Sequence, residues 1–386
     1  MNMVIRWFQR NLKGDPIIWS IVFILSLISI LAVYSATGTL AFRLMDGNTE
    51  YYLFRHTMMV FLGLFAMWVA HKIDYRYYSK ISRFFLWVSV PLLIFTWKFG
   101  TNINEASRWI TIPFINQMFQ PSDLAKLALI TNLAAMLSKK QQNIGDLSNT
   151  LVPMLLWCGL ICGLIAMTNF STSVLLLITC MLVLFLGRVP VKYLVMLMFI
   201  GVLAGAVAFS FGQRKQTVIS RVKDFVDPTE IPYQAQQSYI AISTGGIAGK
   251  GPGNSDEKNF LPHPYSDFIF SILIEEYGLA GGAVIVILYL ALLYRGMVTA
   301  AKSDRAFGGL LSAGLSFAVV MQAMINMGVA VGLGPITGLP LPFVSMGGTS
   351  LLFTGISMGI ILSVSRGEIE EGYARVNELR NVSKAA

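Results

Sequence analysis

The sequence predicts an all-α protein that crosses a membrane about ten times. Hydrophobic residues make up 55% and charged residues 13% of the 386 residues, and soluble domains carry about 25% charged residues. The mean hydropathy is +0.64. A spanning helix needs about 20 apolar residues, and its backbone must be hydrogen-bonded within the protein. We therefore expect a single integral membrane domain, 1–386, built of helices.

Apolar runs follow one another along the whole chain. Ten candidate spans lie near 17–36, 56–71, 83–98, 121–138, 150–168, 172–187, 191–211, 267–295, 307–331 and 349–365. Most connections are short, but three are long, near 99–120, 212–266 and 332–348. Long segments rich in Gly, Pro, aromatic and charged residues are usually functional in compact proteins. The tail, 366–386, is charged and reads as a partly helical extension.

The positive charge is distributed by topology. The formal net charge is +9, with 29 Lys and Arg residues. Most of these lie in alternate connections, starting with the N-terminal segment, and short basic connections stay in the cytoplasm. We therefore predict that both termini are cytoplasmic and that the three long segments are extracytoplasmic. Membrane topology explains most of this positive charge, so we expect no nucleic-acid partner.

Metal and nucleotide motifs are weak in this chain. Cys158, Cys162 and Cys180 lie in apolar spans, and no Cys/His cluster with metal-ligand spacing occurs. The stretch GGIAGKGPG, 245–253, contains Lys250 but lacks the GxxxxGK[ST] spacing of a phosphate loop. It predicts a tight surface turn. Contact with a pyrophosphate on a lipid carrier remains an open alternative.

Two ionisable residues begin the span near 121–138. Asp123 and Lys126 lie in QPSDLAKLALI, where Pro121 suits a first helical turn. Residues three apart lie on one helix face, and intramembrane charges are functional candidates. Two interpretations stay open: a structural ion pair at a helix start, or a charged pair lining a polar cavity.

Three carboxylates lie at or inside the span near 267–295. Asp267 ends the loop LPHPYSD at the mouth of the span, and Glu275 and Glu276 lie within it. Around a helix they are about 80° and 180° from Asp267, so the three do not share a face. Because Asp267 borders the loop, it is either an acid at the start of a helix or a catalytic carboxylate. Glu275 and Glu276 read more simply as polar groups in the bundle interior.

The long segment 212–266 is basic near its start. GQRKQTVISRVKDFVDP carries Arg214 and Arg221, and Lys250 follows in the glycine-rich stretch. On an outer surface such residues suit an anionic lipid or a pyrophosphate. Ordinary solvated loop charge is the alternative.

Three long stretches together resemble one family. QQSYIAISTGGIAGKGPGNSDEKNFLPHPYSDFIFSILIEEYGLAG, NMGVAVGLGPITGLPLPFVSMGGTSLL and ASRWITIPFINQMFQPSDLAKLALI resemble the signatures of the SEDS (shape, elongation, division and sporulation) proteins of FtsW/RodA type. Their order and the predicted spans also agree, so the resemblance covers essentially the whole chain. GPGNSDEKNFLP is closer to the division-type FtsW branch.

The resemblance implies a peptidoglycan glycosyltransferase that polymerises lipid II at the outer face of the bacterial inner membrane, at the division septum. Its expected partners are a class B penicillin-binding protein and other divisome or elongasome membrane proteins. The family's essential carboxylate falls on Asp267, and its charged pair falls on Asp123 and Lys126. Candidates for binding substrate or pyrophosphate are Arg108, Lys126, Arg214, Arg221, Lys250 and Ser345, with Mg²⁺ or Mn²⁺ as an open cofactor.

The chain departs from the family pattern at four places. Tyr265 stands where the family usually has His, which puts an obligatory imidazole there in doubt. Asp123 replaces the usual Glu and is one methylene shorter. Asn169 lies where a Pro-Asp pair is common, and Met346 replaces the Tyr of SYGG. None of these changes removes Asp267.

The chemistry implied is a single inversion. The 4-hydroxyl of one sugar attacks the anomeric carbon of another, and this needs a general base and stabilisation of the leaving pyrophosphate. Two other classes stay open on the sequence: a lipid II flippase or transporter, and a non-enzymatic scaffold of the division machinery. A transporter would place polar groups at several depths, whereas the candidates here gather towards the outer end.

Overall fold

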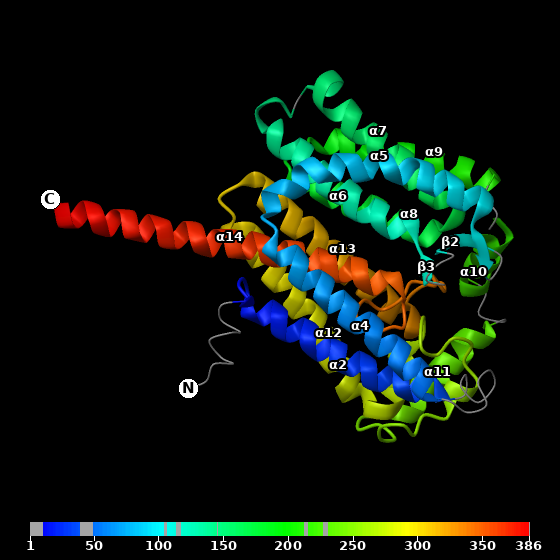
Figure 1. Ribbon diagram of the computed structural model, residues 1–386. Coiled ribbons are helices and arrows are strands. Elements are labelled where there is room, and N and C mark those ends of the chain that lie inside the picture. The colour runs from blue at the N-terminus through cyan, green and yellow to red at the C-terminus, as the bar shows by residue number, and fades with distance from the viewer. Residues whose placement is uncertain are drawn as a thin grey trace.

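A computed structural model gives the arrangement of the chain. It describes residues 11–38, 49–103, 106–112, 117–144, 146–211, 215–226 and 231–385. The described residues form a bundle of long helices that run roughly along one axis, and α14 leaves the bundle at its C-terminal end (Figure 1).

The long helices coincide in order with the predicted spans. They are α2 (Pro16–Ala36), α4 (Thr49–Lys72), α5 (Tyr75–Phe99), α6 (Pro121–Lys139), α7 (Val152–Thr168), α8 (Phe170–Leu186), α9 (Val191–Phe211), α12 (Ile269–Lys302), α13 (Ala306–Ala330) and α14 (Thr349–Ala385). Seven candidate spans in the described part of the chain are long and apolar enough to cross a membrane, on α2, α4, α5, α7, α12, α13 and α14. The multi-spanning helical class is therefore confirmed, whereas the count of ten spans stays a prediction.

The long connections contain structure that the sequence did not predict. A small antiparallel sheet, in the order β1-β2-β3, is formed by β1 (Thr101–Ile103), β2 (Ala106–Ile112) and β3 (Gln117–Phe119). In β2 the run RWITI is rich in aromatic and β-branched residues, which favour strands. The all-α expectation is corrected here. The second connection contains α10 (Lys215–Val226), α11 (Tyr233–Gly245) and a short 3-10 turn, Glu257–Asn259.

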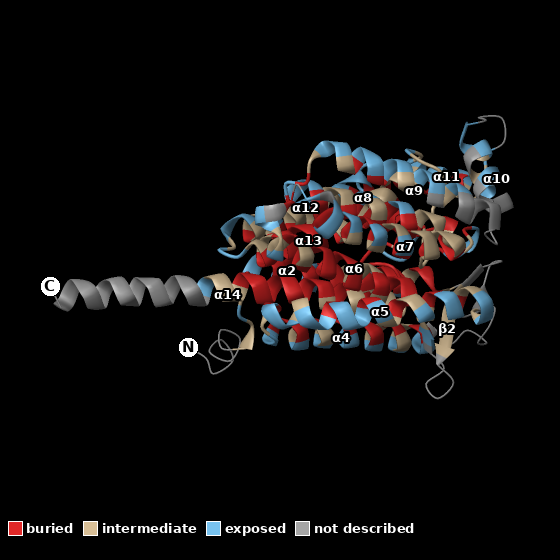
Figure 2. Cartoon of the chain, turned by 90° about the horizontal axis from the view of Figure 1, so that it is seen from above, coloured by how far each residue is buried: buried red, intermediate tan, exposed pale blue. Residues whose placement is uncertain are grey.

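The core follows the central helices. Buried residues concentrate on α6, α13 and the first part of α14, whereas α4 and α5 keep many exposed apolar residues (Figure 2). The helices α4 and α14 approach closely at glycines. A Cβ on Gly355 would lie 2.2 Å from the carbonyl oxygen of Gly63, so only a residue without a side chain fits. Small residues at helix contacts are typical of membrane bundles.

A buried ion pair fixes the start of the bundle. Asp15 caps α2 by accepting a hydrogen bond from the backbone N–H of Ile17, at 2.9 Å. Its other oxygen accepts a hydrogen bond from Nε of Arg295 on α12, at 2.7 Å. The buried carboxylate therefore satisfies a helix terminus and a partly buried cation together, and it joins α2 to α12.

Candidate functional site

A cavity of about 470 Å³ lies at the end of the bundle where the three long connections meet. Such a volume is typical of ligand sites. Its lining comes from α4, β2, β3, α6, the α7–α8 junction, α13 and the loops before α12 and α14. Its polar lining residues include Arg55, His56, Arg108, Gln120, Asp123, Lys126, Asn169, His263, Tyr265, Ser266, Asp267 and Gln322.

The start of α6 contributes an ion pair to the cavity. Pro121 occupies the first turn, as its fixed φ allows. The Nζ of Lys126 lies 2.8 Å from Oδ1 of Asp123, and it also donates to Oε1 of Gln322, at 3.4 Å. Oδ2 of Asp123 is buried and has no hydrogen-bond partner among the described residues. The pair is therefore structural and cavity-lining at once, and one carboxylate oxygen remains available to a ligand or water.

The loop that carries Asp267 is attached to the loop before α14. Asn326 on α13 donates from Nδ2 to the carbonyl oxygens of Asp267 and Leu339, at 2.8 and 2.7 Å. Ser345 donates from Oγ to the carbonyl oxygen of Ser266, at 2.6 Å. These hydrogen bonds hold the backbone of Ser266 and Asp267 in place, and so position the Asp267 side chain. Asp267 itself precedes α12, whose N-cap residue is Phe268, so its side chain is not a helix cap.

A guanidinium and a carboxylate face the same gap in the cavity. A Cβ placed on Gly338 would lie 3.4 Å from Oδ2 of Asp267 and 3.9 Å from Nη1 of Arg108. Arg108 is held on β2 by a hydrogen bond from Nε to the carbonyl oxygen of Thr168, at 3.2 Å. Gly338 has φ of +66°, a conformation that favours glycine. The missing side chain keeps the space between the two charges open.

Two strained residues lie in the loops around Asp267. His263 has φ of +58° and Phe343 has φ of +63°. Positive φ is uncommon for bulky residues, and such strain is often found at functional sites. Tyr265 lies between His263 and Asp267 in the sequence. Burial raises the pKa of its phenol, and the nearby Tyr52 and Asp267 also raise it. Its phenol therefore stays protonated at neutral pH, so it can donate a hydrogen bond where an imidazole would titrate.

His56 is a cavity residue that the sequence did not single out. Ser29 donates from Oγ to the carbonyl oxygen of Val344, at 2.9 Å. The hydroxyl has one proton, so the 2.8 Å contact between Ser29 Oγ and His56 Nε2 requires Nε2 to donate. The buried Nδ1 of His56 has no hydrogen-bond partner among the described residues. The only sequence signal was a histidine inside an apolar span.

The structure distributes the predicted site residues unevenly. Asp267, Asp123, Lys126 and Arg108 line one cavity. Arg221 lies outside the lining, where its Nη1 donates to the carbonyl oxygen of Ile336, at 2.9 Å.

Burial lowers the pKa of Arg221, and the charge of Asp267 opposes that shift. The cation therefore lies within electrostatic range of the carboxylate. The hydroxyl of Ser345 is buried in backbone hydrogen bonds, which places this residue as a support of the loop. Arg214 lies outside the described residues.

Lys250 and Glu275 form a separate network. Glu275 is fully buried and accepts hydrogen bonds from Nζ of Lys250 at 2.6 Å, from the backbone N–H of Asp256 at 3.0 Å, and from the hydroxyl of Ser255. Lys250 also pairs with Asp256, at 2.9 Å. Glu275 therefore attaches the glycine-rich loop to α12. Glu276 accepts a hydrogen bond from the hydroxyl of Ser35 on α2.

The glycines of this loop allow direct backbone contact with α12. The helix is interrupted at Gly278, where φ is +70°. Backbone N–H groups of Lys250 and Leu279 donate to the carbonyl oxygens of Glu275 and Gly246, both at 2.9 Å. The stretch is thus a packed backbone junction, which agrees with a turn and explains its glycines without a nucleotide.

The residues offer little to a metal ion by themselves. Among the described residues, no group of three or more His, Cys, Asp or Glu side chains is placed to hold one. The cavity does contain two carboxylates, on Asp123 and Asp267. Mg²⁺ is commonly bound by one or two carboxylates together with substrate phosphates, so the donor set fits a metal that arrives with a phosphorylated substrate.

Comparison with known proteins identifies the family. The family profile of FtsW, RodA and SpoVE, described as "Cell cycle protein", matches residues 15–370. The chain belongs to this family.

Relatives across the family cover nearly all of the chain. "Probable peptidoglycan glycosyltransferase FtsW" of Geobacter sp. (strain M18) is 33% identical over 368 residues, covering 92% of this chain and 98% of the relative. "Stage V sporulation protein E" of Bacillus subtilis (strain 168) is 32% identical over 366 residues, covering 92% and 98%.

Solved structures agree with the FtsW/RodA/SpoVE fold. One chain, from "Structural coordination of polymerization and crosslinking by a peptidoglycan synthase complex", gives a TM-score of 0.69 at 26% identity, covering 92% of this chain and 98% of that chain. The rod shape determining protein RodA of Thermus thermophilus gives 0.65 at 24% identity, covering 92% and 97%. This second likeness supports the fold alone.

Proposed function

We propose that this member of the family is a peptidoglycan glycosyltransferase that polymerises lipid II during cell division. The observation that carries the proposal is one cavity, at one end of a membrane bundle, that combines the carboxylate of Asp267 with the cations Lys126 and Arg108. Relatives that match almost the whole chain carry the FtsW glycosyltransferase name. The family resemblance of the sequence and this geometry therefore lead to the same reaction.

Asp267 is the general base in this proposal. The acceptor's 4-hydroxyl forms a new C–O bond to the anomeric carbon of the donor sugar. The bond from that carbon to the pyrophosphate oxygen breaks, and the pyrophosphate leaves with the electron pair. Asp267 takes the hydroxyl proton. A positioned base of this kind contributes roughly 10²- to 10⁴-fold.

Lys126 and Arg108 stabilise the leaving group. Negative charge develops on the pyrophosphate as the bond breaks, and cations fixed in a sheltered site stabilise that charge without reorganising. The hydrogen bonds that hold Arg108 to Thr168 and Lys126 to Gln322 fix both groups in advance. Arg221 adds a further positive charge within electrostatic range of Asp267.

An apolar groove next to the ion pair suits a polyprenyl chain. A second cavity of about 50 Å³ shares Asp123 and Lys126 with the first and continues between α6, α8, α13 and α14. Its walls are mainly apolar, formed by Leu127, Ile130, Leu175, Leu176, Leu315, Val319, Phe353 and others. In this proposal, the apolar walls receive the first carbons of the lipid tail of a pyrophosphate bound at Lys126.

The proposed function and the predicted topology together give the cellular setting. The protein is a multi-pass protein of the bacterial inner membrane. Its cavity faces outward, both termini are cytoplasmic, and it acts at the division septum. A class B penicillin-binding protein crosslinks the strands, which agrees with a solved relative from a peptidoglycan synthase complex. Other divisome or elongasome proteins complete the assembly. Asp267 and Asp123, the carboxylates that line the cavity, would hold a Mg²⁺ or Mn²⁺, and the ion would neutralise pyrophosphate charge.

The deciding experiment incubates purified full chain with lipid II and a divalent cation, with and without the transpeptidase partner. Glycan chain length is read on a gel for wild type, Asp267→Asn and the control Asp224→Asn, all at matched thermal stability. We expect polymer from wild type and the control, and none from Asp267→Asn. Polymer from all three would remove Asp267 as the base. No polymer from wild type with its partner would favour a flippase or a scaffold.

A further inference from the structure

Another polar cavity, separate from the two described above, lies at the end of the bundle opposite to Asp267. It measures about 220 Å³ and lies between α5 and α6, lined by Ser79, Lys80, Arg83, Asn132, Ala135, Met136 and Lys139. The helix α6 begins beside β3 at the catalytic end and runs to the far end of the bundle (Figure 1). Lys139 is 13 residues beyond Lys126 on the same helix, which is about 20 Å along its axis. The two cavities are therefore separate.

Three cations of this cavity have no counter-charge. No carboxylate lines it, and within the described part of the chain Lys80, Arg83 and Lys139 form no ion pair. The positive-inside rule explains why basic residues occur at this end. It does not explain why three of them surround one hollow between two helices, where their mutual repulsion is unfavourable.

A buried amide also faces the cavity. Asn132 lies in the middle of α6 and is 5% exposed. Among the described residues, its Nδ2 donates only to the sulfur of Met136, at 3.4 Å, and a thioether is a weak acceptor. A buried N–H donor among unpaired cations is a site for an oxyanion, because it would gain a full hydrogen bond there.

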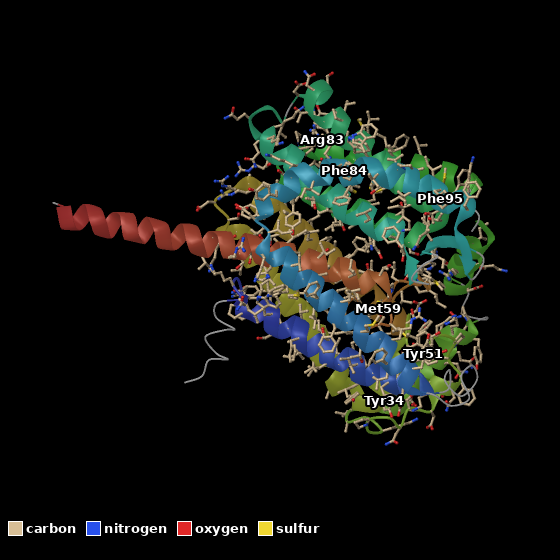
Figure 3. The ribbon with its side chains drawn as sticks, in the orientation of Figure 1. Tyr34, Tyr51, Met59, Arg83, Phe84 and Phe95 are labelled. Atoms are coloured by element: carbon tan, nitrogen blue, oxygen red, sulfur yellow. The ribbon has the colours of Figure 1, made fainter. Side chains whose placement is uncertain are left out.

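The surroundings indicate that the anion belongs to a lipid. On α5, Phe84 and Trp87 follow the cavity residue Arg83 by one and four positions and are 64% and 63% exposed, and Ile81, between Lys80 and Arg83, is 39% exposed. Arg83 and Phe84 occupy neighbouring positions on the outside of α5 (Figure 3). A free phosphate would use the cations alone, whereas a phospholipid would also cover this apolar face with its acyl chains.

We propose that the pocket between α5 and α6 binds the phosphate headgroup of an anionic phospholipid of the inner leaflet. Arg83, Lys80 and Lys139 neutralise the headgroup, and Asn132 donates a hydrogen bond to it. The acyl chains lie along Phe84 and Trp87. This site is independent of the glycan chemistry at the other end, so it can be tested without lipid II.

Native mass spectrometry of the purified full chain tests the site. The chain is titrated with phosphatidylglycerol, with phosphatidylcholine and, separately, with phosphatidylglycerol in millimolar inorganic phosphate. The variant Arg83→Gln/Lys139→Gln is compared with Lys192→Gln/Lys302→Gln, which removes the same charge from other basic connections of the chain. Each cation near a membrane surface contributes about fivefold in affinity, so the pocket variant, which removes two, should lose roughly thirtyfold in phosphatidylglycerol affinity.

We expect wild type to prefer phosphatidylglycerol over phosphatidylcholine, also in the presence of inorganic phosphate. The pocket variant should lose this preference, and the control pair should keep it. The charge-conserving Arg83→Lys/Lys139→Arg variant should keep most of it, which separates loss of binding from loss of folding. Equal losses in the pocket and control pairs would show a general surface effect and overturn the proposal. Competition by inorganic phosphate would show a free-anion site and overturn its lipid part.

Discussion

The Nζ of Lys126 lies 2.8 Å from Oδ1 of Asp123, which is one turn earlier on α6. The pair borders both the polar cavity and the apolar groove. Asp123 is 5% exposed. Removing one member of a buried pair leaves an uncompensated charge, which typically costs about 3 kcal/mol or more. The same two residues therefore affect both folding and chemistry, and a double variant can separate the two effects.

We predict that Lys126→Met lowers the thermal stability and abolishes polymerisation. The double variant Asp123→Asn/Lys126→Met should regain most of the stability, because no unpaired carboxylate remains, but it should stay inactive. Thermal melts and lipid II gels on the same preparations measure the two effects. Activity in the stabilised double variant would show that the pair is only structural.

The interruption of α12 at Gly278 gives a second prediction. A Cβ at this position would lie 2.1 Å from the carbonyl oxygen of Ile247, and φ is +70°. Gly278→Ala should therefore destabilise the protein by more than about 2 kcal/mol through strain and overpacking. The control is Gly163→Ala in α7, where nothing lies within 4 Å, and it should be neutral or slightly stabilising. Similar melting temperatures for both variants would contradict the observed junction.

The attachment of the glycine-rich loop depends on Glu275. Glu275→Gln keeps the shape but removes the charge that holds Lys250 and accepts backbone N–H bonds. We expect faster hydrogen exchange and faster proteolysis in 246–258, together with a lower melting temperature. Glu50→Gln, an exposed acid at the start of α4, serves as the control. Unchanged protection of the loop would show that its backbone contacts alone hold it.

His56 provides a test of the cavity lining. His56→Phe removes both ring nitrogens, including the Nε2 donor to Ser29, whereas His56→Gln keeps one donor and one acceptor group. We predict that turnover of lipid II falls at least tenfold in the Phe variant and is partly recovered in the Gln variant, because His56 lines the cavity and only Gln keeps polar atoms at this position. Equal activity in the two variants would argue for a packing role only.

Part of the candidate site was predictable because its residues belong to recognisable local patterns. Asp123 and Lys126 are one turn apart after a proline, and Asp267 follows a proline-rich loop. His56 gave no such signal, because a histidine inside an apolar helix carries no information about its neighbours. The glycines around Lys250 suggested contact with a pyrophosphate, which stays a prediction, and in the structure Lys250 pairs with Glu275.

The sequence by itself determined the helical membrane architecture, since long apolar runs in lipid have few alternatives to helices. Its motifs also pointed to the family and to Asp267. Tertiary structure alone decided that Asp267, Lys126 and Arg108 share a cavity, because Asp267 lies more than a hundred positions from the other two, and Arg108 and Lys126 lie on a strand and a helix. It also decided that Glu275 is a structural attachment and that Lys80, Arg83 and Lys139 converge on one pocket. Contacts between helices depend on rotation and packing, which no local pattern encodes.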